Sequence, residues 1–379
     1  MNKKILFLTG TRADFGKLKS LIRICNATPG FDVSIFATGM HLQEQYGYTF
    51  HEIEKSGFTN IHGFANHQAG SGMDTTMAKT IEGLSAYVQH SRPDLLVVHG
   101  DRIETLAGSI VGALNNILVA HIEGGEVSGT VDELIRHAVT KMSHLHFVSN
   151  DEAAARLVQM GELPNSIHVI GSPDMDVMAS TELPSLDEVN HHYEIPFDAY
   201  GIIMFHPVTT ELNQMKFASD NLFEAARQSG LNYVVVYPNN DMGSDFILES
   251  IHALNGDSRF RVFPSIRFES FLTLLRNSRF ILGNSSAGIR EAPFYGIPTV
   301  NVGSRQSGRS DNPNIVHCSY EIGSILKGIK DAVEANRFPS MHNFGAGSSD
   351  KRFIQTLQNK STWNTESQKR FLDIKLSHA

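Results

Sequence analysis

Residues 95–137 have the sequence LLVVHGDRIETLAGSIVGALNNILVAHIEGGEVSGTVDELIRH. The pattern predicts an apolar strand, a polar turn, a helix, a second apolar strand and a further polar turn that opens another helix. Asp101 follows the first strand, Glu123 follows the second, and Asp132 lies on the first turn of the next helix. Open α/β sheets place ligand sites beyond the carboxyl ends of their strands. This stretch therefore predicts a parallel sheet with acidic side chains gathered at its ligand-binding edge.

The same alternation extends along the chain in both directions. Further strands are expected over 5–9, 31–37, 146–149, 168–171, 201–205, 233–237, 261–263, 280–282 and 299–302. Helices are expected from 14, over 75–90, 151–160, 211–229, 244–254 and 268–276, from about 287, and over 321–335, 350–358 and 366–376. Strands that alternate with helices are typical of a parallel, doubly wound sheet.

The pattern weakens between the two runs of strands, where Pro173, Pro184 and Pro196 are spaced through the chain. We place the interdomain connection at 173–200, between a first domain at 1–172 and a second at 201–362. The predicted fold class is α/β, with two Rossmann-like domains facing across a cleft and parallel sheets flanked by helices.

Composition limits the classes of protein that the chain can be. Its 379 residues are enough for two α/β domains. A hydrophobic content of 41% and a charged content of 19% are typical of a globular enzyme and argue against broad disorder. The net charge of −8, from 32 basic and 40 acidic residues, argues against a nucleic-acid partner.

Cysteine content and hydropathy indicate the compartment. Cys25 and Cys318 are too few for a disulfide framework or a thiolate metal site, which fits a reducing cytosol. The apolar run in MNKKILFLTG is too short for a signal peptide, and no segment approaches 18 uninterrupted apolar residues. We expect a cytoplasmic protein with no membrane partner.

The first strand is followed by GTRADFGK at 10–17, which is not the G-x-G-x-x-G fingerprint of dinucleotide sites. Arg12 and Lys17 flank a predicted helix start, where cations and backbone amides suit a phosphate group. The alternative is a solvated helix start with surface charges. His206 follows the first strand of the second domain at the matching position. It is a candidate for diphosphate binding or proton transfer, or a histidine with a structural hydrogen bond.

Residues 283–293, GNSSAGIREAP, lead from a strand into a predicted helix. The hydroxyls of Ser285 and Ser286 and the backbone amides there predict an anion site, although an ordinary helix cap is an alternative. Glu291 is a candidate acceptor for sugar hydroxyls, or simply helps the helix to start. Arg309, after the next strand, is a candidate cationic contact, with surface solvation as the alternative.

Asp132 and Arg136 are four residues apart and share a helical face. A salt bridge at the helix start is the plain explanation for Asp132. The glycines at 124, 125 and 129 favour a site, because they let the backbone come close to a ligand.

Seven motifs in order, over nearly the whole chain, resemble the UDP-N-acetylglucosamine 2-epimerase family. They are GTRADFGK, HGDR, HIEGGE, SGTVDELIRH, FHPVTTE, GNSSAGIREAP and GSRQSGR. The non-hydrolysing branch of that family typically shows V-E-A-G and P-E-E-x-N-R where this chain has HIEGGE and SGTVDELIRH. The chain looks instead like the hydrolysing branch, the NeuC/SiaA-type enzymes of bacterial sialic acid synthesis.

The resemblance implies a fold like that of GT-B glycosyltransferases, with the nucleotide sugar in the interdomain cleft. It also implies a C-terminal helix within 363–379 that packs back on the first domain, a homodimer or homotetramer, and neither a cofactor nor a metal. Carried over motif by motif, the catalytic carboxylates are Asp101, Glu123 and Asp132. The implied substrate or UDP contacts are Arg12, Lys17, Arg102, Arg136, His206, Ser285, Ser286, Glu291 and Arg309, with Glu126 and His137 in supporting positions.

The implied reaction converts UDP-GlcNAc and water to N-acetylmannosamine and UDP, the first step of sialic acid synthesis. Elimination of UDP would give 2-acetamidoglucal, and hydration would follow with C2 protonated from the opposite face. Two faces of one carbon need at least two proton-transfer groups, and crowded carboxylates push one another's pKa values apart. The residues do not decide which acid removes the proton and which returns it.

Four alternatives remain. Related family members act on UDP-diacetamido sugars or GDP-linked sugars, and the non-hydrolysing branch releases UDP-ManNAc. A GT-B glycosyltransferase would need an acceptor surface and fewer acids. A sugar-nucleotide sensor would be expected to lack the acids, whereas Asp101, Glu123 and Asp132 are all present.

Overall fold

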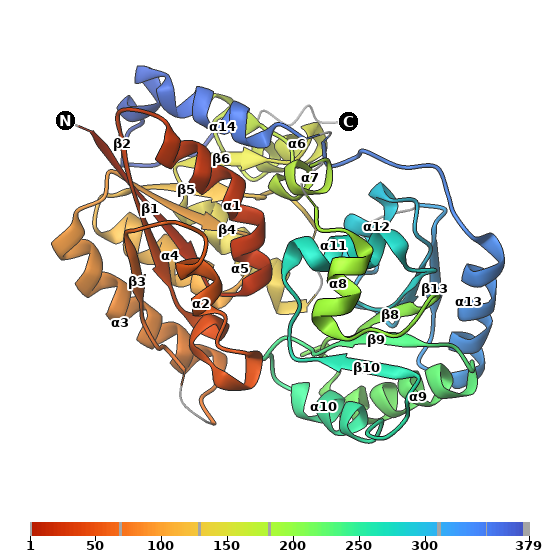
Figure 1. The fold of residues 1–379 in the computed structure, drawn as a ribbon. Coiled ribbons are helices and arrows are strands. Elements are labelled where there is room, and N and C mark those ends of the chain that lie inside the picture. Colours follow the sequence, from red (N-terminus) through yellow and green to blue (C-terminus); the bar gives the residue numbers. More distant parts are fainter. Residues whose placement is uncertain are drawn as a thin grey trace. The chain divides into compact units, whose positions relative to one another are not determined.

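The computed structural model describes residues 2–67, 70–127, 130–180, 183–308, 312–345 and 347–373. The chain forms two compact units. Unit 1 comprises residues 1–126, 132–179 and 343–379, and unit 2 comprises residues 127–131 and 180–342. Each unit has a parallel sheet flanked by helices, so the predicted α/β class of two Rossmann-like domains is confirmed (Figure 1).

The sheet of unit 1 has the strand order of a Rossmann fold, in which the first strand of the chain lies near the centre. All pairings within it are parallel. Its strands, in order across the sheet, are β3 (Ile61–Gly63), β2 (Phe31–Ala37), β1 (Lys3–Thr9), β4 (Leu95–His99), β5 (Leu118–Ile122), β6 (Leu145–Val148) and β7 (Ile167–Val169).

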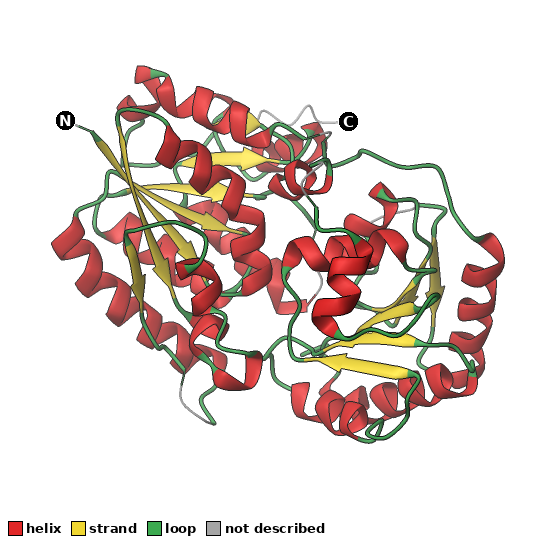
Figure 2. Ribbon diagram, in the orientation of Figure 1, coloured by secondary structure: helices red, strands yellow, loops and turns green. Residues whose placement is uncertain are grey.

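Helices pack on this sheet through alternating strand residues, because successive side chains of a strand point to opposite faces (Figure 2). Ile5 and Phe7 belong to the core shared with α1 and α14, while Leu8 and Val98 contact α4 at Gly108. The helices of unit 1 are α1 (Arg12–Ala27), α2 (Phe50–Glu54), α3 (Met73–Ser91), α4 (Ile103–Leu114), α5 (Thr130–Met142), α6 (Asp151–Gln159), α7 (Pro173–Met178) and α14 (Ser349–Gln358).

Unit 2 repeats the same strand order with its own apolar core. Its strands across the sheet are β10 (Phe260–Phe263), β9 (Tyr233–Val236), β8 (Gly201–Met204), β11 (Ile281–Gly283), β12 (Thr299–Val302) and β13 (Ile315–Cys318). Its helices are α8 (Leu186–Tyr193), α9 (Met215–Gln228), α10 (Ser244–His252), α11 (Phe268–Asn277), α12 (Glu291–Phe294) and α13 (Ile322–Ala335).

The chain divides at 179/180 and 342/343, compared with the 172/173 and 362/363 expected from the sequence. The first unit extends further because α7 packs on α1 through Lys17 Nζ and Asp174 Oδ2, 2.7 Å apart. It resumes earlier because α14, which lies beside α1 in Figure 1, is anchored by Ser349 Oγ donating to Asp176 Oδ2 at 2.6 Å.

The predicted helix over 366–376 is wrong for residues 366–373, which form no helix. Several of their polar groups bind other parts of unit 1, although Glu366 also pairs with Arg370 at 3.0 Å. The Ser367 carbonyl accepts from His144 Nε2 at 3.0 Å, and the Leu372 amide donates to the Gly161 carbonyl at 3.0 Å. The helix that packs on unit 1 is α14, whose Phe353 ring lies 4.6 Å from the Phe147 ring.

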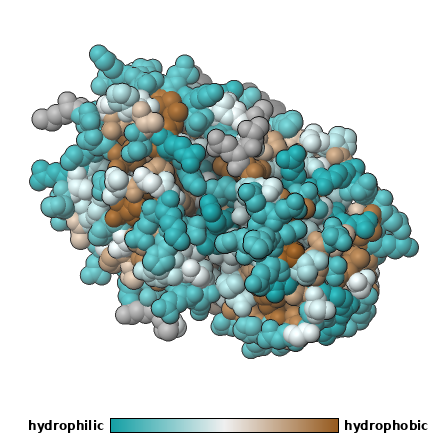
Figure 3. Space-filling model, in the orientation of Figure 1, coloured by the Kyte–Doolittle hydropathy of each residue, from teal (hydrophilic) through white to brown (hydrophobic). Residues whose placement is uncertain are grey.

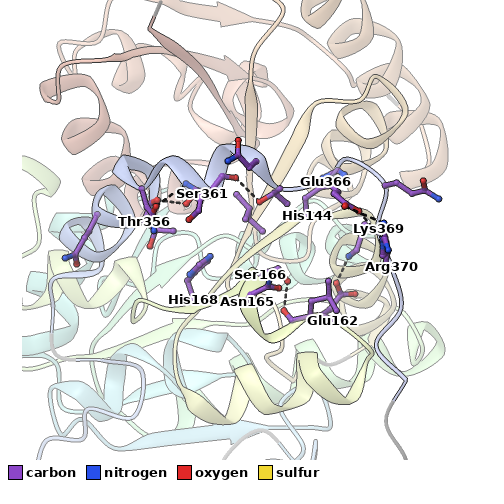
Figure 4. Close-up of a pocket in the computed structure, with 18 residues that line it drawn as sticks. His144, Glu162, Asn165, Ser166, His168, Thr356, Ser361, Glu366, Lys369 and Arg370 are labelled. Atoms are coloured by element: carbon purple, nitrogen blue, oxygen red, sulfur yellow. Dashed lines mark hydrogen bonds and ion pairs between the residues drawn. The ribbon is translucent and has the colours of Figure 1, made fainter.

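Glu366, Gln368, Lys369 and Arg370 line part of a cavity of about 730 Å³ in unit 1 (Figure 4). Beside it, Glu162 is buried and accepts from Lys141 and Lys369, each at 2.6 Å, and from His146 at 3.0 Å. Burial alone would raise the pKa of Glu162, but the His146, Lys141 and Lys369 hydrogen bonds outweigh it and lower the pKa to about 2. The C-terminal segment is thus fastened to α5 and to the turn after α6.

Within the described ranges, no helix has the length and apolarity needed to cross a membrane. Hydrophilic side chains cover most of the face drawn in Figure 3, interrupted by smaller apolar patches. This distribution is ordinary for a protein whose apolar side chains are mainly in its cores.

Candidate active site

The candidate catalytic acids of unit 1 come from two neighbouring strands. His99, the last residue of β4, pairs in register with Ile122, the last residue of β5. Asp101 and Glu123 therefore leave the same edge of the sheet, and the prediction from residues 95–137 holds for the positions of these two acids. Asp132 lies in the first turn of α5 and is partly exposed.

Arg136 joins this group. Its guanidinium is buried and donates to the Asp101 carboxylate through Nη2 and to the Glu123 carbonyl oxygen through Nη1. The bond to Asp101 is charge-assisted, and the second bond fixes the orientation of the guanidinium against the backbone of Glu123. Arg136 was expected to contact substrate; the structure shows that it holds two of the predicted acids, one turn after Asp132 on α5.

Glu123 has an unusual backbone and a fully engaged side chain. Its φ angle of 64° lies in the left-handed region, which non-glycine residues adopt mainly at special positions. Its side chain is buried, with Oε2 2.9 Å from His99 Nε2 and Oε1 accepting from the Ser172 hydroxyl. The acid is thus held at both oxygens.

His99 is the main residue that the sequence reasoning missed. Its Nδ1 lies 2.7 Å from Asp14 Oδ1, so the ring bridges two carboxylates, those of Asp14 and Glu123. Burial alone would lower the pKa of His99, but the two carboxylates outweigh it and raise the pKa to about 10. At neutral pH the ring is an imidazolium that donates in both directions. The available signal was a histidine ending an apolar strand, directly before Gly100-Asp101.

Arg12 is the first residue of α1, and Lys17 lies in its second turn. The Thr11 hydroxyl caps this helix by accepting from the Asp14 amide at 3.1 Å, which explains where the helix starts. Arg12 Nη2 lies 3.7 Å from Glu52 Oε1, and Lys17 Nζ lies 2.7 Å from Oδ2 of the buried Asp174. Both cations are at the edge where β1 ends, and their expected part in diphosphate binding stays a prediction.

A cavity of about 140 Å³ opens at the ends of β1 and β4. Lys17, His99, Asp101, Arg102 and Glu104 are among its lining residues. Arg102, in the turn after β4, has its Nε 3.5 Å from Glu104 Oε2. Its expected contact with substrate stays a prediction. The cavity brings cationic and acidic groups together around a volume suited to part of a sugar.

Glu126 and His137, expected in supporting positions, and His121 in the same stretch make other contacts. His121 lies inside β5, where its Nε2 donates to the Gly100 carbonyl at 2.9 Å, and burial lowers its pKa to about 3. Glu126 is buried and accepts from Ser149 Oγ at 2.7 Å. His137 pairs with Glu133 on the surface of α5. These contacts are structural in character.

In unit 2, His206 follows β8 and is fixed by Asn284, which follows the neighbouring strand β11. Asn284 accepts from the His206 amide at 2.7 Å and donates to the His206 carbonyl at 2.9 Å. His206 Nδ1 accepts from the Asn239 amide at 3.1 Å, so a proton on the neutral ring is at Nε2. Gly283 permits this arrangement, because at φ 134° a Cβ would lie 2.1 Å from the Met204 carbonyl oxygen.

The helix expected from about residue 287 is wrong. Instead, Ser286–Gly288 form a 3-10 turn, and the four-residue helix α12 follows. Pro293 has no N–H to donate to the Ile289 carbonyl four residues earlier, so a continuous helix from residue 287 would lack that hydrogen bond. Ser285 Oγ accepts from the Ala287 amide at 3.3 Å, as in the capping alternative, and Ser286 is next in the chain.

Glu291 is buried at the start of α12, beside the buried Arg290 in the chain. Arg305 Nη1 and Gln306 Nε2 both donate to the Asn284 carbonyl, at 3.2 and 2.7 Å. The loop after β12 thus supports the turn that carries the candidate serines. Arg309 lies outside the described residues.

Several known proteins resemble this chain in sequence or in fold. The family model described as UDP-N-acetylglucosamine 2-epimerase matches residues 23–358. A Neisseria meningitidis protein named UDP-N-acetylglucosamine 2-epimerase is 47% identical, over 99% of this chain and 100% of its own length. A Legionella pneumophila protein named UDP-N,N'-diacetylbacillosamine 2-epimerase (hydrolyzing) is 34% identical, over 94% and 96%.

An Escherichia coli protein named polysialic acid biosynthesis protein P7 is 31% identical, over 95% of this chain and 89% of its own. Among solved structures, the Methanocaldococcus jannaschii UDP-GlcNAc 2-epimerase in complex with UDP-GlcNAc and UDP has a TM-score of 0.78 at 20% identity. That match covers 93% of this chain and 99% of the other. At this identity the structural likeness shows the fold.

Proposed function

This chain belongs to the UDP-N-acetylglucosamine 2-epimerase family, and from that membership we propose that it is a hydrolysing 2-epimerase acting on UDP-GlcNAc. The products would be N-acetylmannosamine and UDP. The observation that carries the proposal is the acid cluster of unit 1, in which Arg136 joins Asp101 to the Glu123 backbone and Asp132 lies one turn before Arg136. Acids that flank a sugar carbon are what removal and return of a proton at that carbon require.

Two observations favour the hydrolysing reaction. The motifs HIEGGE and SGTVDELIRH depart from the pattern of the non-hydrolysing branch. The Legionella relative, matched over nearly the whole chain, carries the word hydrolyzing in its name. The name of the Escherichia coli relative favours a place in the synthesis of sialic acid.

The first step is elimination. One carboxylate removes the proton at C2, the bond between C1 and the UDP oxygen breaks, and a double bond forms between C1 and C2 to give 2-acetamidoglucal. Departing UDP gains negative charge at its phosphate, so cations and hydrogen-bond donors placed there lower the barrier. Arg12, Lys17, His206, Ser285 and Ser286 are the proposed donors.

The second step is hydration. Water adds at C1 and releases a proton, while an acid delivers a proton to C2 from the opposite face. The product is free N-acetylmannosamine. We assign these transfers to Asp101, Glu123 and Asp132, with Arg102 and Arg309 as further substrate contacts and Glu291 as the acceptor for the ribose hydroxyls.

Incubation of the full chain with UDP-GlcNAc in deuterated water tests the proposal. Release of UDP together with N-acetylmannosamine deuterated at C2, followed by nuclear magnetic resonance, is the expected result. Stable UDP-ManNAc as the product would overturn the hydrolysing assignment, and a lack of reaction with UDP-GlcNAc would overturn the substrate assignment.

Single substitutions test the site. Asp101→Asn, Glu123→Gln and Asp132→Asn should each lower turnover by about 10²–10⁴-fold while UDP binding is largely kept, as expected for loss of proton transfer. Glu366→Gln is the matched control. Glu366 is exposed, and among the contacts described it pairs only with Arg370, four residues later in the chain. Full activity in all three acid variants would show that the site is wrongly assigned.

A second candidate substrate is a UDP-diacetamido sugar, which the name of the Legionella relative favours. Competition between the two sugar nucleotides, read as kcat/KM for each, separates the candidates. The better substrate is the one with the higher ratio, because discrimination is a difference in transition-state binding.

A further inference from the structure

Glu123 is the acid with the least freedom in the cluster. It is 2% exposed, its Oε1 accepts from the Ser172 hydroxyl and its Oε2 faces His99 Nε2 at 2.9 Å. Hydrogen bonds to a carboxylate favour its charged form and make it a poorer base. Removal of a carbon-bound proton is therefore an unfavourable task for Glu123.

Asp101 has the opposite character. Its side chain is 24% exposed, it lines the cavity of about 140 Å³, and its charge is supported by Arg136. A carboxylate that is partly exposed and lines a cavity can reach a substrate proton there, whereas the enclosed Glu123 is less accessible. The two acids thus have surroundings that favour different tasks.

His99 places an N–H proton beside Glu123. The ring lies between Asp14 and Glu123, and Asp14 is fixed by the Gly10 amide, which donates to Asp14 Oδ2 at 3.1 Å. The pKa of His99, raised to about 10, means that both ring nitrogens carry protons at neutral pH. One of the two ring protons, at Nε2, therefore lies next to Oε2 of Glu123, and the other, at Nδ1, faces Asp14.

The helices and strands around His99 contribute other charged or titratable groups. They are Lys17 on α1, Asp101, Arg102 and Glu104 after β4, His121 on β5, and Arg136 on α5. His121 is neutral because burial lowers its pKa to about 3, and Asp101 is paired with Arg136. Asp14 and Glu123 are the carboxylates that hydrogen-bond the ring of His99.

We propose that His99 is a positioning residue that stores the proton which Glu123 delivers to C2 of the sugar. The inference rests on the proposed function. In the step, the bond between His99 Nε2 and its proton breaks and an O–H bond forms at Glu123 Oε2. The imidazolium becomes a neutral ring that keeps its Nδ1–H bond to Asp14, so the net charge of the three side chains is unchanged. Glu123 then transfers this proton to C2 during hydration, and the set is reloaded from solvent.

His99→Gln separates storage of a proton from simple hydrogen bonding. The glutamine amide can still donate to Glu123, but it has no proton to transfer. With UDP-GlcNAc as substrate, we expect UDP release within about tenfold of the wild-type rate and N-acetylmannosamine formation lowered by about 10²–10⁴-fold. The intermediate 2-acetamidoglucal, which has not yet received a proton at C2, should accumulate instead of N-acetylmannosamine. The decline of wild-type sugar formation near pH 10 should be absent in the variant.

Asp14→Asn is the second variant, since it removes the charge that holds the imidazolium but keeps a side chain of the same shape. It should move the high-pH decline of sugar formation to lower pH, with KM little changed. His51→Gln is the control, because His51 Nδ1 makes a similar 2.8 Å contact with Glu54 but is exposed. This control should behave as wild type.

Equal loss of UDP release and of sugar formation in His99→Gln, with circular dichroism and thermal unfolding unchanged, would overturn the inference. Wild-type behaviour of both variants would also overturn it. If the wild-type enzyme released no UDP from UDP-GlcNAc, the proposed function itself would fail and the inference with it. An active wild-type enzyme with unaffected variants refutes the inference alone.

Discussion

Glu162→Gln should destabilise unit 1 measurably, although the residue lies at the opposite end of the β-strands from the acids. Glu162 is 2% exposed and accepts hydrogen bonds from Lys141, His146 and Lys369. Glutamine has the same shape but no charge, so two ammonium groups lose their shared partner. Figure 4 shows the link between Glu162 and Lys369, which holds residues 366–372 in place.

The pKa of Glu162 gives the size of the effect. It falls from an ordinary value of 4.5 to about 2, and each pKa unit corresponds to about 1.4 kcal/mol, so the ionised form contributes about 3 kcal/mol. Because the folded pKa is the lower one, this stability is present above about pH 4.5 and is lost as the pH falls towards 2. Lys141 is 42% exposed and accounts for little of it, so most of the effect comes from Lys369 and His146.

Urea unfolding followed by circular dichroism measures the difference. At pH 7, Glu162→Gln should lower the free energy of unfolding by about 3 kcal/mol, and the gap to wild type should narrow between pH 4.5 and 3. Glu366→Gln is the control, since the exposed pair of Glu366 and Arg370 should contribute less than about 1 kcal/mol. Equal effects of the two substitutions, or a gap independent of pH, would refute the reasoning.

Three further predictions concern packing. Gly283→Ala should destabilise unit 2 by about 2–3 kcal/mol in urea unfolding, because its Cβ would lie 2.1 Å from the Met204 carbonyl oxygen; Gly230→Ala, which meets no atom within 4 Å, should cost less. Phe353→Ala should cost about 3–5 kcal/mol, because the fully buried ring packs in the core of unit 1, and a loss below 1 kcal/mol would contradict that packing. Cys25 should react with a thiol reagent only on unfolding, since burial raises its pKa; rapid labelling of the native protein at Cys25 would contradict this expectation.

The sequence predicted the fold where local and tertiary preferences agree. Strands such as residues 95–99 are continuous apolar runs, as expected for strands covered on both faces, and they were found within a residue or two. Strand β3 was missed because three residues, two of them exposed, carry no apolar signal. Strand β13 was missed because its sequence, IVHC, has only a short apolar run.

The acids of the candidate site were predicted from the sequence, but the hydrogen bonds that join them to other residues were not. Asp101 and Glu123 were identifiable because each directly follows a strand. The contact between His99 and Asp14 joins residues 85 positions apart, so no local pattern signals it. His121, two residues before Glu123, lies inside β5 and donates to the Gly100 carbonyl. The sequence pattern does not show which way a histidine at a strand end points. Its hydrogen-bond partners decide its role.

The division of the chain into two units also affects the order in which the units can fold during synthesis. Unit 2 is nearly continuous from 180 to 342, whereas unit 1 needs α14, whose Phe353 lies 6.4 Å from the Phe7 ring. As the polypeptide leaves the ribosome, unit 2 can complete its core while the first 179 residues still lack this helix. Domains generally fold as units during synthesis, so the half that begins first finishes last. Until residues 349–358 emerge, α14 cannot yet cover the apolar side chains of Phe7 and Phe147.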